Sequence, residues 1–410
     1  MSDTTAATVA VPPRLRTLDA LRGLTILWVT VMHVAADTVG LPGADAGPSA
    51  LWTALAEARP IEAARTVLRG VLFLPGFRLD VLLFVTGLVL GLGRPRPARV
   101  LFSHRARAIL PGYWLGTLLV LAVMMIGAAV RAAVGGAPFA DELQYGSRLA
   151  RAPYEFVPGD LILGLTVLGR FTAPAAVQVV SPSLWYIALV AQFYLAYPLM
   201  RWLFERLGPP AFLAVCAIVM LAARLAALGG APLGPFDVGS ALAAFLPFRL
   251  LSPALGMVAA PWFRQHGERL QRTLSPTPML AVATALLLLA GWIGSMLIPP
   301  VTLLTIVGPS LALVPAVAGL WVVAAWALAR PAAGRLLIWA GQASLALLVI
   351  QDALRFTVGT VQSLGVPLAP WLWWLLPAYV ALALLLTRWW DPVVRGVTDA
   401  CWPPVRPAAR

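Results

Sequence analysis

The sequence predicts an all-α, polytopic membrane protein with about ten transmembrane helices and both termini in the cytoplasm. The chain of 410 residues is 60% hydrophobic and only 11% charged, and its mean hydropathy is +0.85. A soluble protein of this length carries about twice that charged fraction. Apolar runs of about 20 residues, each long enough to cross a bilayer as a helix, recur along the whole chain.

The chain is also strongly basic, with a formal net charge of +13, and every basic side chain is arginine. The arginines are dispersed between apolar runs, which favours orientation in a membrane over nucleic-acid binding. With ten spans and cytoplasmic termini, most arginines fall in cytoplasmic segments, in agreement with the positive-inside rule. We therefore expect membrane lipid and no nucleic acid as a partner. With three histidines in the chain, we expect no metal site.

The elements follow in order from the apolar runs. Residues 1–13 are small and polar and contain proline, so we expect a disordered cytoplasmic tail; residues 14–395 form the transmembrane domain, and residues 396–410 a second cytoplasmic tail. The run Leu161–Leu168 is too short to span, so we expect it to be interfacial or re-entrant. The predicted spans are Leu18–Val39, Val71–Gly93, Ile109–Val130, Leu184–Leu203, Ala211–Leu228, Ala241–Phe263, Met279–Ile298, Leu304–Ala329, Leu336–Val358 and Leu368–Trp389.

The first span carries an arginine and a histidine on one face. Arg22 and His33 are eleven positions apart, which on a helix returns to within about 20° of the starting direction and rises roughly 16 Å. Ionisable groups inside a span usually face a cavity or a partner and indicate function. A neutral imidazole in a partly dry site can act as a general base toward an alcohol. The alternative is an interfacial arginine and a packed, hydrogen-bonded histidine.

The second span offers a partner for that imidazole. Because this span runs antiparallel to the first, its outer part, with Arg78 and Asp80, lies at the depth of His33. Asp80 can therefore orient the His33 ring, or it can neutralise Arg78 instead.

The other arginines inside spans differ in their surroundings. Arg355 follows Asp352 by three residues on one helical face, which favours a local ion pair. Arg249 has no acid nearby in the sequence, which favours a place on the wall of a polar cavity.

The densest basic segment lies between the second and third spans. It holds Arg94, Arg96, Arg99, Arg105 and Arg107. Charge alone favours contact with anionic lipid headgroups on the cytoplasmic side, and a second interpretation is a site for a phosphate-rich cosubstrate, since guanidinium groups bind phosphates well.

Five stretches, collinear and covering most of the chain, resemble the membrane acyltransferase-3 family. The first is LDALRGLTILWVTVMH (18–33), which carries the family's arginine and histidine at Arg22 and His33. The others are RLDVLLFVTGLVLG (78–91) with Asp80, FSHRARAILPGYWLG (102–116), SLWYIALVAQFYLAYPL (183–199) and GQASLALLVIQ (341–351).

This resemblance implies an integral-membrane O-acyltransferase with ten spans. His33 would be the general base, with Arg22 and Asp80 as further catalytic residues. An acyl-coenzyme A cosubstrate, carrying an acetyl group in the simplest case, would place its phosphates at Arg105 and Arg107 and its arm along Arg22; no cofactor would be bound permanently. The acceptor would be a hydroxyl of a glycan, a glycolipid or a glycosylated or polyketide-type metabolite, at the plasma membrane.

The chain departs from the family pattern at several positions. The family's tandem glutamates are replaced by Val190 and Ala191, its second basic arginine by Ala108 and its late histidine by Gln351. These changes bear on the acceptor more than on the reaction class, because Arg22, His33 and Asp80 are present. The alternatives to an acyltransferase are a transporter or flippase for a lipid-linked or acylated substrate, and a non-catalytic membrane partner or sensor.

Overall fold

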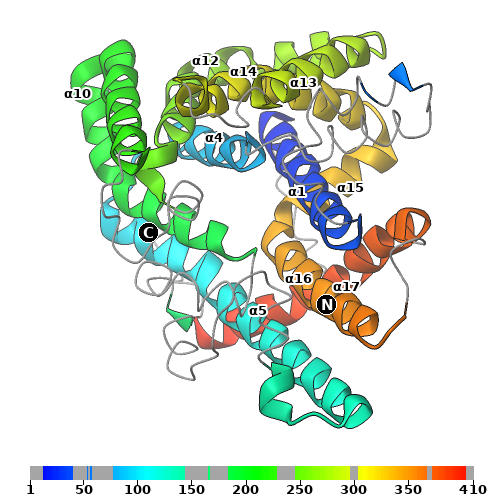
Figure 1. Cartoon of the computed structure of the whole chain (residues 1–410). Helices are drawn as coiled ribbons and strands as arrows, with labels where there is room; N and C mark the ends of the chain where they lie inside the picture. The colour runs from blue at the N-terminus through cyan, green and yellow to red at the C-terminus, as the bar shows by residue number, and fades with distance from the viewer. Residues whose placement is uncertain are drawn as a thin grey trace, which may run out of the picture.

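The computed structural model is all-helical in the residues that it describes, so the predicted all-α class is confirmed (Figure 1). It describes residues 13–39, 53, 56–57, 77–143, 165–166, 183–228, 245–295, 303–366 and 372–402. The helices are α1 (Pro13–Val39), α4 (Phe77–Leu92), α5 (Ala98–Gly135), α10 (Trp185–Leu228), the 3-10 helix η1 (Leu246–Arg249), α12 (Leu251–Leu274), α13 (Met279–Ser295), α14 (Leu303–Leu328), α15 (Pro331–Gln342), α16 (Ser344–Ser363) and α17 (Leu372–Cys401).

Several helices have the length and composition of membrane spans. In the described ranges four pass this test: Ala98–Gly135, Trp185–Ala227, Ser310–Leu328 and Ser344–Ser363. Helices α12 and α13 pass it only as a pair, and they are bent by 111° to each other, which suits a broken span or a re-entrant loop. These helices make the chain a membrane protein, while ten spans and cytoplasmic termini stay a prediction.

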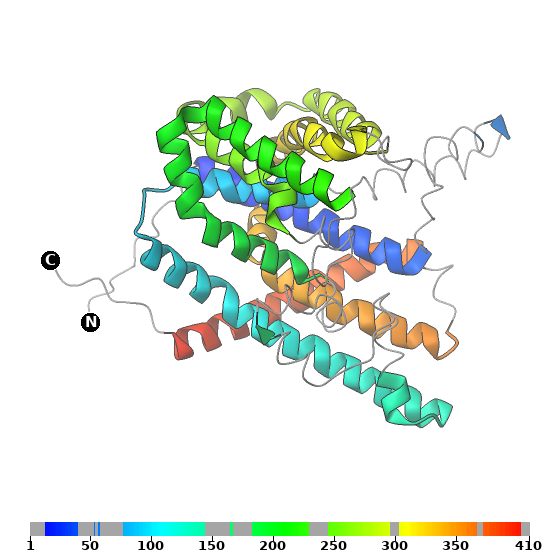
Figure 2. The same cartoon turned by 60° about the vertical axis from the view of Figure 1, so that its left-hand side comes forward.

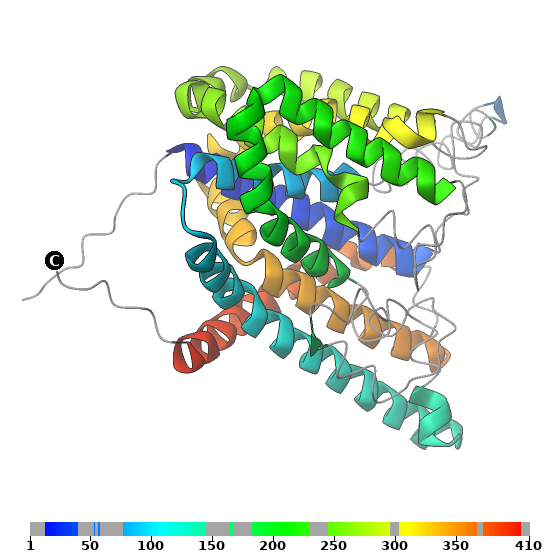
Figure 3. The same ribbon diagram turned by 90° about the vertical axis from the view of Figure 1, so that its left-hand side faces the viewer.

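Helix α10 contains two of the predicted spans in one element. Its helical dihedral angles are interrupted at Gly208, where φ is 75° and ψ is 168°, a conformation that favours glycine. Two prolines, Pro209 and Pro210, follow directly. The green ribbon therefore doubles back on itself (Figures 2 and 3). The arms before and after Gly208 correspond to the spans expected at Leu184–Leu203 and Ala211–Leu228.

Other predicted boundaries differ from the observed helices. The span expected at Leu336–Val358 is broken at Ala343 into α15 and α16, and the described part of the span expected at Ala241–Phe263 contains η1 before α12. Helix α5 starts eleven residues before the predicted Ile109, and α17 continues to Cys401. The helices extend further because their arginine-rich ends keep helical hydrogen bonds outside the apolar runs. The expected tail at 1–13 and the run Leu161–Leu168 lie almost wholly outside the described residues.

Helix α1 packs among many other helices and contacts α4, α12, α14, α15, α16 and α17. Its closest approach is to α15, through two glycines. A Cβ atom on Gly23 would lie 1.9 Å from the Leu337 carbonyl oxygen, and a Cβ on Gly341 would lie 2.0 Å from the Asp19 carbonyl oxygen. Only glycine permits this distance between the two backbones. The close packing holds α1, the helix that carries His33, against α15.

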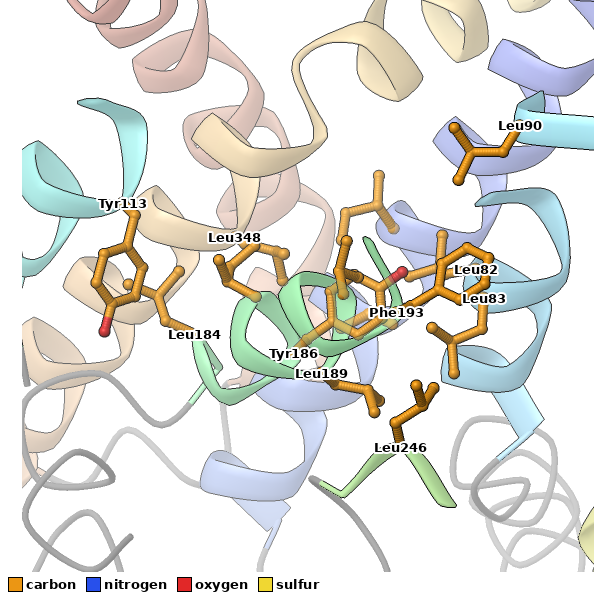
Figure 4. Packing of buried hydrophobic residues seen from close by; sticks show 14 of the residues in the cluster. Leu82, Leu83, Leu90, Tyr113, Leu184, Tyr186, Leu189, Phe193, Leu246 and Leu348 are labelled. Carbon is orange, nitrogen blue, oxygen red and sulfur yellow. The ribbon is translucent and has the colours of Figure 1, made fainter. Parts of the chain in front are cut away.

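A buried apolar core joins α1, α4, α10 and α16. Figure 4 shows part of this core, with Leu82 of α4, Phe193 of α10 and Leu348 of α16 coming together from segments far apart in the sequence. Phe193 is fully buried, and Tyr197, one turn later on α10, donates a hydrogen bond from its hydroxyl to the Leu90 carbonyl at 3.0 Å. The core thus holds the first turns of α10 beside α4.

Candidate functional site

His33 lines a cavity of about 110 Å³ that is enclosed by α1, α4, α16 and the start of α10. The walls are mostly apolar, and Figure 4 shows three of the lining residues, Leu82, Tyr186 and Leu348, on three different helices. The full set is Ile26, Val29, Met32, His33, Leu79, Leu82, Ser183, Trp185, Tyr186 and Leu348. An imidazole on the wall of a largely apolar cavity can exchange a proton with a small polar group held there.

A compact polar network contacts the imidazole. His33 Nδ1 lies 3.0 Å from Gln351 Nε2 and 3.3 Å from Ser183 Oγ. Ser183 Oγ donates to Asp352 Oδ1 at 2.5 Å, and the Ser183 backbone N–H donates to Asp352 Oδ2 at 2.9 Å. Ser183 is 3% exposed, and Gln351 and Asp352 are fully buried. Gln351 and Ser183 therefore form a buried polar environment around the Nδ1 side of the His33 ring.

The acid expected to orient His33 has other partners. Among the described residues, Asp80 Oδ2 accepts from Arg249 Nη1 at 2.6 Å and Asp80 Oδ1 accepts from Ser252 Oγ at 2.7 Å. The expected His33–Asp80 contact is therefore wrong. Arg249, which was expected to line a polar cavity, instead pairs with an acid that is distant in the sequence. Asp80 and Arg249 are 169 positions apart, so sequence spacing could not reveal the pair. The other option, pairing with the Arg78 side chain, lies outside the described residues.

Arg22 lies on α1 as expected, two turns from the helix start. Its guanidinium group is 3.6 Å from the Asp19 carboxylate, one turn earlier, and about a quarter of the side chain is exposed. Two long-range hydrogen bonds lie at the same end of α1: Thr17 donates to Gln271 of α12 at 2.8 Å, and Gln342 of α15 donates to Asp19 at 3.3 Å. Arg22 is thus a partly exposed cation at the end of α1 away from His33.

The two arginines expected to bind phosphate lie near the start of α5. Arg107 Nη2 is 2.7 Å from Asp399 Oδ1 of α17, whose side chain is 68% exposed. Arg105 lies over the Tyr194 ring at 4.9 Å, and its Nε is buried with no hydrogen-bond partner within the described part of the chain. Arg107 and Asp399 also line a cavity of about 380 Å³ between α5, α16 and α17. Both arginines therefore lie near the same end of α5, and Arg107 is paired with an exposed acid.

His104 lies beside these arginines near the start of α5.

Two further arginines inside predicted spans have partners in the structure. Arg355 lies 3.4 Å from Asp352, so the expected local pair is confirmed. Arg224 is buried and donates to the Phe248 carbonyl oxygen from Nε and Nη2, at 2.9 and 2.6 Å. Arg224 thereby fixes the 3-10 turn that precedes α12.

Sequence reasoning missed Ser183 and singled out Asp352 only as a partner of Arg355. One signal did point to the right place, because the family's late histidine corresponds to Gln351, and Gln351 contacts His33. Ser183 opens the fourth similar stretch and lies 150 positions from His33. Its contact with the imidazole depends on how α10 and α16 pack against α1, which spacing along the chain does not specify.

Comparison with known proteins gives one match. The family model described as "Acyltransferase domain" matches residues 15–388, which covers α1 through most of α17. No curated protein and no solved structure matches the chain.

Proposed function

Because the chain belongs to the acyltransferase-3 family and is therefore a membrane acyltransferase, we propose that it moves an acyl group from an acyl-coenzyme A to a hydroxyl acceptor, with His33 as general base. The acyl group in the simplest form of this proposal is acetyl. The acceptor class is a hydroxyl of a glycan, glycolipid or glycosylated metabolite. The membrane is the plasma membrane.

The main support for the proposal is the position of His33 in the structure. The ring lines a small, mostly apolar cavity, and its Nδ1 is engaged by buried polar groups. A general base needs a fixed ring within hydrogen-bond reach of the reacting hydroxyl, in a site that excludes bulk water. Both conditions favour His33 over His266, whose Nδ1 lies 3.1 Å from the carbonyl oxygen of Trp262 on an exposed helix face.

The reaction then follows the chemistry of acyl transfer. His33 takes the proton of the acceptor hydroxyl as its oxygen attacks the thioester carbonyl carbon. The carbon–sulfur bond of the tetrahedral intermediate breaks, and the leaving thiolate takes the proton from the imidazolium. The products are an ester and free coenzyme A, and His33 returns to its neutral form.

The donor is proposed to approach from the end of the molecule that carries Arg105 and Arg107. Guanidinium groups bind phosphates through charge-assisted hydrogen bonds. Arg105 has an unpartnered buried Nε among the described residues, and the Arg107–Asp399 pair is exposed enough to exchange for a phosphate. The acyl arm would pass Arg22, which lies roughly 16 Å along α1 from His33.

The experiment is turnover of acetyl-coenzyme A by the purified protein, with wild type, His33→Ala and His266→Ala compared. We expect all three to bind the donor, and we expect only His33→Ala to lose turnover, by about 100-fold or more. His266→Ala is the matched control because it removes a histidine outside the cavity. Full turnover by His33→Ala would exclude His33 as the base, and absence of donor binding by a folded wild type would exclude acyl-coenzyme A as the donor.

A further inference from the structure

A second cavity lies where four helix ends meet, far from His33. Its volume is about 220 Å³, and it is bounded by the starts of α1 and α15 and by the ends of α12 and α14. Arg16, on its wall, lies 17 positions before His33, which is roughly 25 Å along the axis of α1. We propose that this cavity binds a phosphate group, and that an anionic membrane phospholipid supplies it. The lining residues are Arg16, Gln271, Leu328, Pro331, Gly334 and Arg335.

The two arginines bring positive charge to the cavity without an acid to balance it. None of the six lining residues is acidic. In the part of the chain that the structure describes, neither Arg16 nor Arg335 forms an ion pair or a hydrogen bond through its side chain, and both residues are exposed. By contrast, Arg22 of α1 lies beside Asp19. Two like charges beside one small cavity repel each other, and an anion bound between them removes that repulsion.

The depth of the cavity favours a lipid phosphate. Leu328 lines the cavity and is the last residue of Ser310–Leu328, a segment with the length and composition of a membrane span. Close to that end, the Arg330 guanidinium lies 3.7 Å from the centre of the Trp326 ring. Tryptophan and arginine at the end of a span are typical of the interface between membrane and water, where lipid phosphates lie. A phospholipid in the bilayer can therefore reach the cavity with its headgroup.

The packing of α1 on α15 separates this cavity from His33. The two helices lie side by side (Figure 1). Arg16 and Gly23 are seven positions apart on α1, so they lie on one face, within about 20° of each other. At Gly23 this face approaches α15 so closely that an added Cβ would lie 1.9 Å from the Leu337 carbonyl oxygen. No ligand arm fits between backbones at that distance. A molecule with its phosphate in the cavity therefore does not reach His33 along this face, which favours a lipid over the acyl donor.

Contacts between the helices fix the walls of the cavity. The Gln271 side chain is hydrogen-bonded at 2.8 Å to Thr17, which is fully buried. Gly334 packs so closely on α14 that an added Cβ would lie 3.2 Å from the Leu328 Cα, and this contact fixes the start of α15 that carries Arg335. Each guanidinium group can form charge-assisted hydrogen bonds to a phosphate. Since the two arginines come from α1 and α15, a phosphate bound by both would bridge these helices.

The test is lipid retention by the purified full-length protein, measured by native mass spectrometry from neutral detergent micelles. The probes are phosphatidylglycerol, which is anionic, phosphatidylcholine, which has no net charge, and coenzyme A, which is a soluble phosphate compound. We expect wild type to retain phosphatidylglycerol over phosphatidylcholine by about tenfold or more, and Arg16→Gln/Arg335→Gln to lose that preference. We expect wild type and the double variant to bind coenzyme A equally.

Two further variants sharpen the comparison. Arg269→Gln is the matched control, because Arg269 is an exposed arginine at the same end of α12 that does not line the cavity. It lies two positions before Gln271, and therefore on roughly the opposite side of that helix. We expect Arg269→Gln to retain phosphatidylglycerol as wild type does. Arg335→Lys keeps the charge but loses the planar fork, so its retention should fall between those of wild type and the double variant.

Each outcome bears on the proposal. Equal retention of the two lipids by wild type, or equal retention of phosphatidylglycerol by wild type and the double variant, would overturn it. If the double variant loses coenzyme A and keeps the lipid, the cavity binds the donor and the lipid assignment is wrong.

Thermal unfolding in micelles without added lipid separates loss of binding from loss of fold. Because the double variant removes two unbalanced charges, we expect it to unfold at the wild-type temperature or above. A lower unfolding temperature would contradict the unbalanced charge. Neither measurement requires turnover, so this inference and the proposed function can fail separately.

Discussion

At the scale of single residues, the buried charges divide into two groups with different roles. Asp80 and Arg249 are 2% and 12% exposed and pair at 2.6 Å, with Ser252 completing the acid's hydrogen bonds. Asp352 is also fully buried but reaches His33 through Ser183. We therefore infer that the Asp80–Arg249 pair joins α4 to η1 and α12, whereas Asp352 belongs to the network that contacts the His33 imidazole.

This assignment predicts that Asp80 matters for stability. Asp80→Ala leaves the Arg249 charge buried without its acid, which typically costs about 3 to 5 kcal/mol of unfolding free energy. Adding Arg249→Met removes that charge and should recover a large part of the loss. Thermal unfolding in detergent, followed by tryptophan fluorescence, measures both variants. Loss of turnover by Asp80→Ala with unchanged stability would instead give Asp80 the catalytic role that the family resemblance implies.

The site was only partly predictable from the sequence, for a physical reason that these residues illustrate. His33 is recognisable because an imidazole inside an apolar run is costly and the similar family stretch carries it. Gln351 is recognisable as the replacement of a family histidine. The pairs Asp80–Arg249 and Ser183–His33 join positions 169 and 150 residues apart, and helical periodicity gives each helix a face without saying which face meets which.

At the scale of elements, glycines set the helix distances. Beside the α1–α15 contact already described, a Cβ on Gly87 of α4 would lie 2.1 Å from the Pro253 carbonyl, and one on Gly256 of α12 would lie 2.1 Å from the Phe84 carbonyl. Gly23 and Gly341 both lie in stretches that resemble the family pattern. Close backbone contact gives these positions a structural reason to be glycine, distinct from the chemistry of the arginine and histidine beside them.

The α1–α15 contact predicts a strong effect of one methyl group. Gly23→Ala would place Cβ 1.9 Å from the Leu337 carbonyl, so the two helices must separate, and we expect a loss of about 1 to 3 kcal/mol. The control is Gly396→Ala on α17, where a Cβ meets nothing within 4 Å and helix propensity favours alanine by about 0.5 to 1 kcal/mol. Thermal unfolding should therefore shift down in the first and up or not at all in the second. A Gly23→Ala variant as stable as wild type would contradict the close contact.

The break at Ala343 is a helix boundary that the composition of the sequence does not predict. The apolar run Leu336–Val358 continues through it without proline or a charged residue before Asp352, so its composition predicts one span. The structure instead ends α15 at Gln342 and begins α16 at Ser344, with Ala343 N–H donating to Trp339 O at 2.9 Å. Packing of α15 on Gly23 and of α16 beside His33 demands two helix directions, and only tertiary contacts carry that information.

At the scale of the whole molecule, contacts between distant elements gather several helix ends at one side. The start of α5 meets the end of α17 through Arg107 and Asp399, and the start of α1 meets the end of α12 through Thr17 and Gln271. Figures 2 and 3 show the starts of α1 and α5 and the end of α17 on the same side. Arginines concentrate at these ends, so the positive-inside rule predicts that this side is cytoplasmic.

The two cysteines provide a direct test of that orientation. Cys401 is exposed at the end of α17, whereas Cys216 is 2% exposed within α10, so a membrane-impermeant maleimide should label Cys401 alone. In intact cells we expect no labelling of the protein, and we expect labelling after permeabilisation, because the prediction places the end of α17 in the cytoplasm. Cys401→Ser should abolish the signal, which separates Cys401 from Cys216. Labelling of Cys401 in intact cells would reverse the orientation, and it would place Arg105 and Arg107 on the side where acyl-coenzyme A is not available.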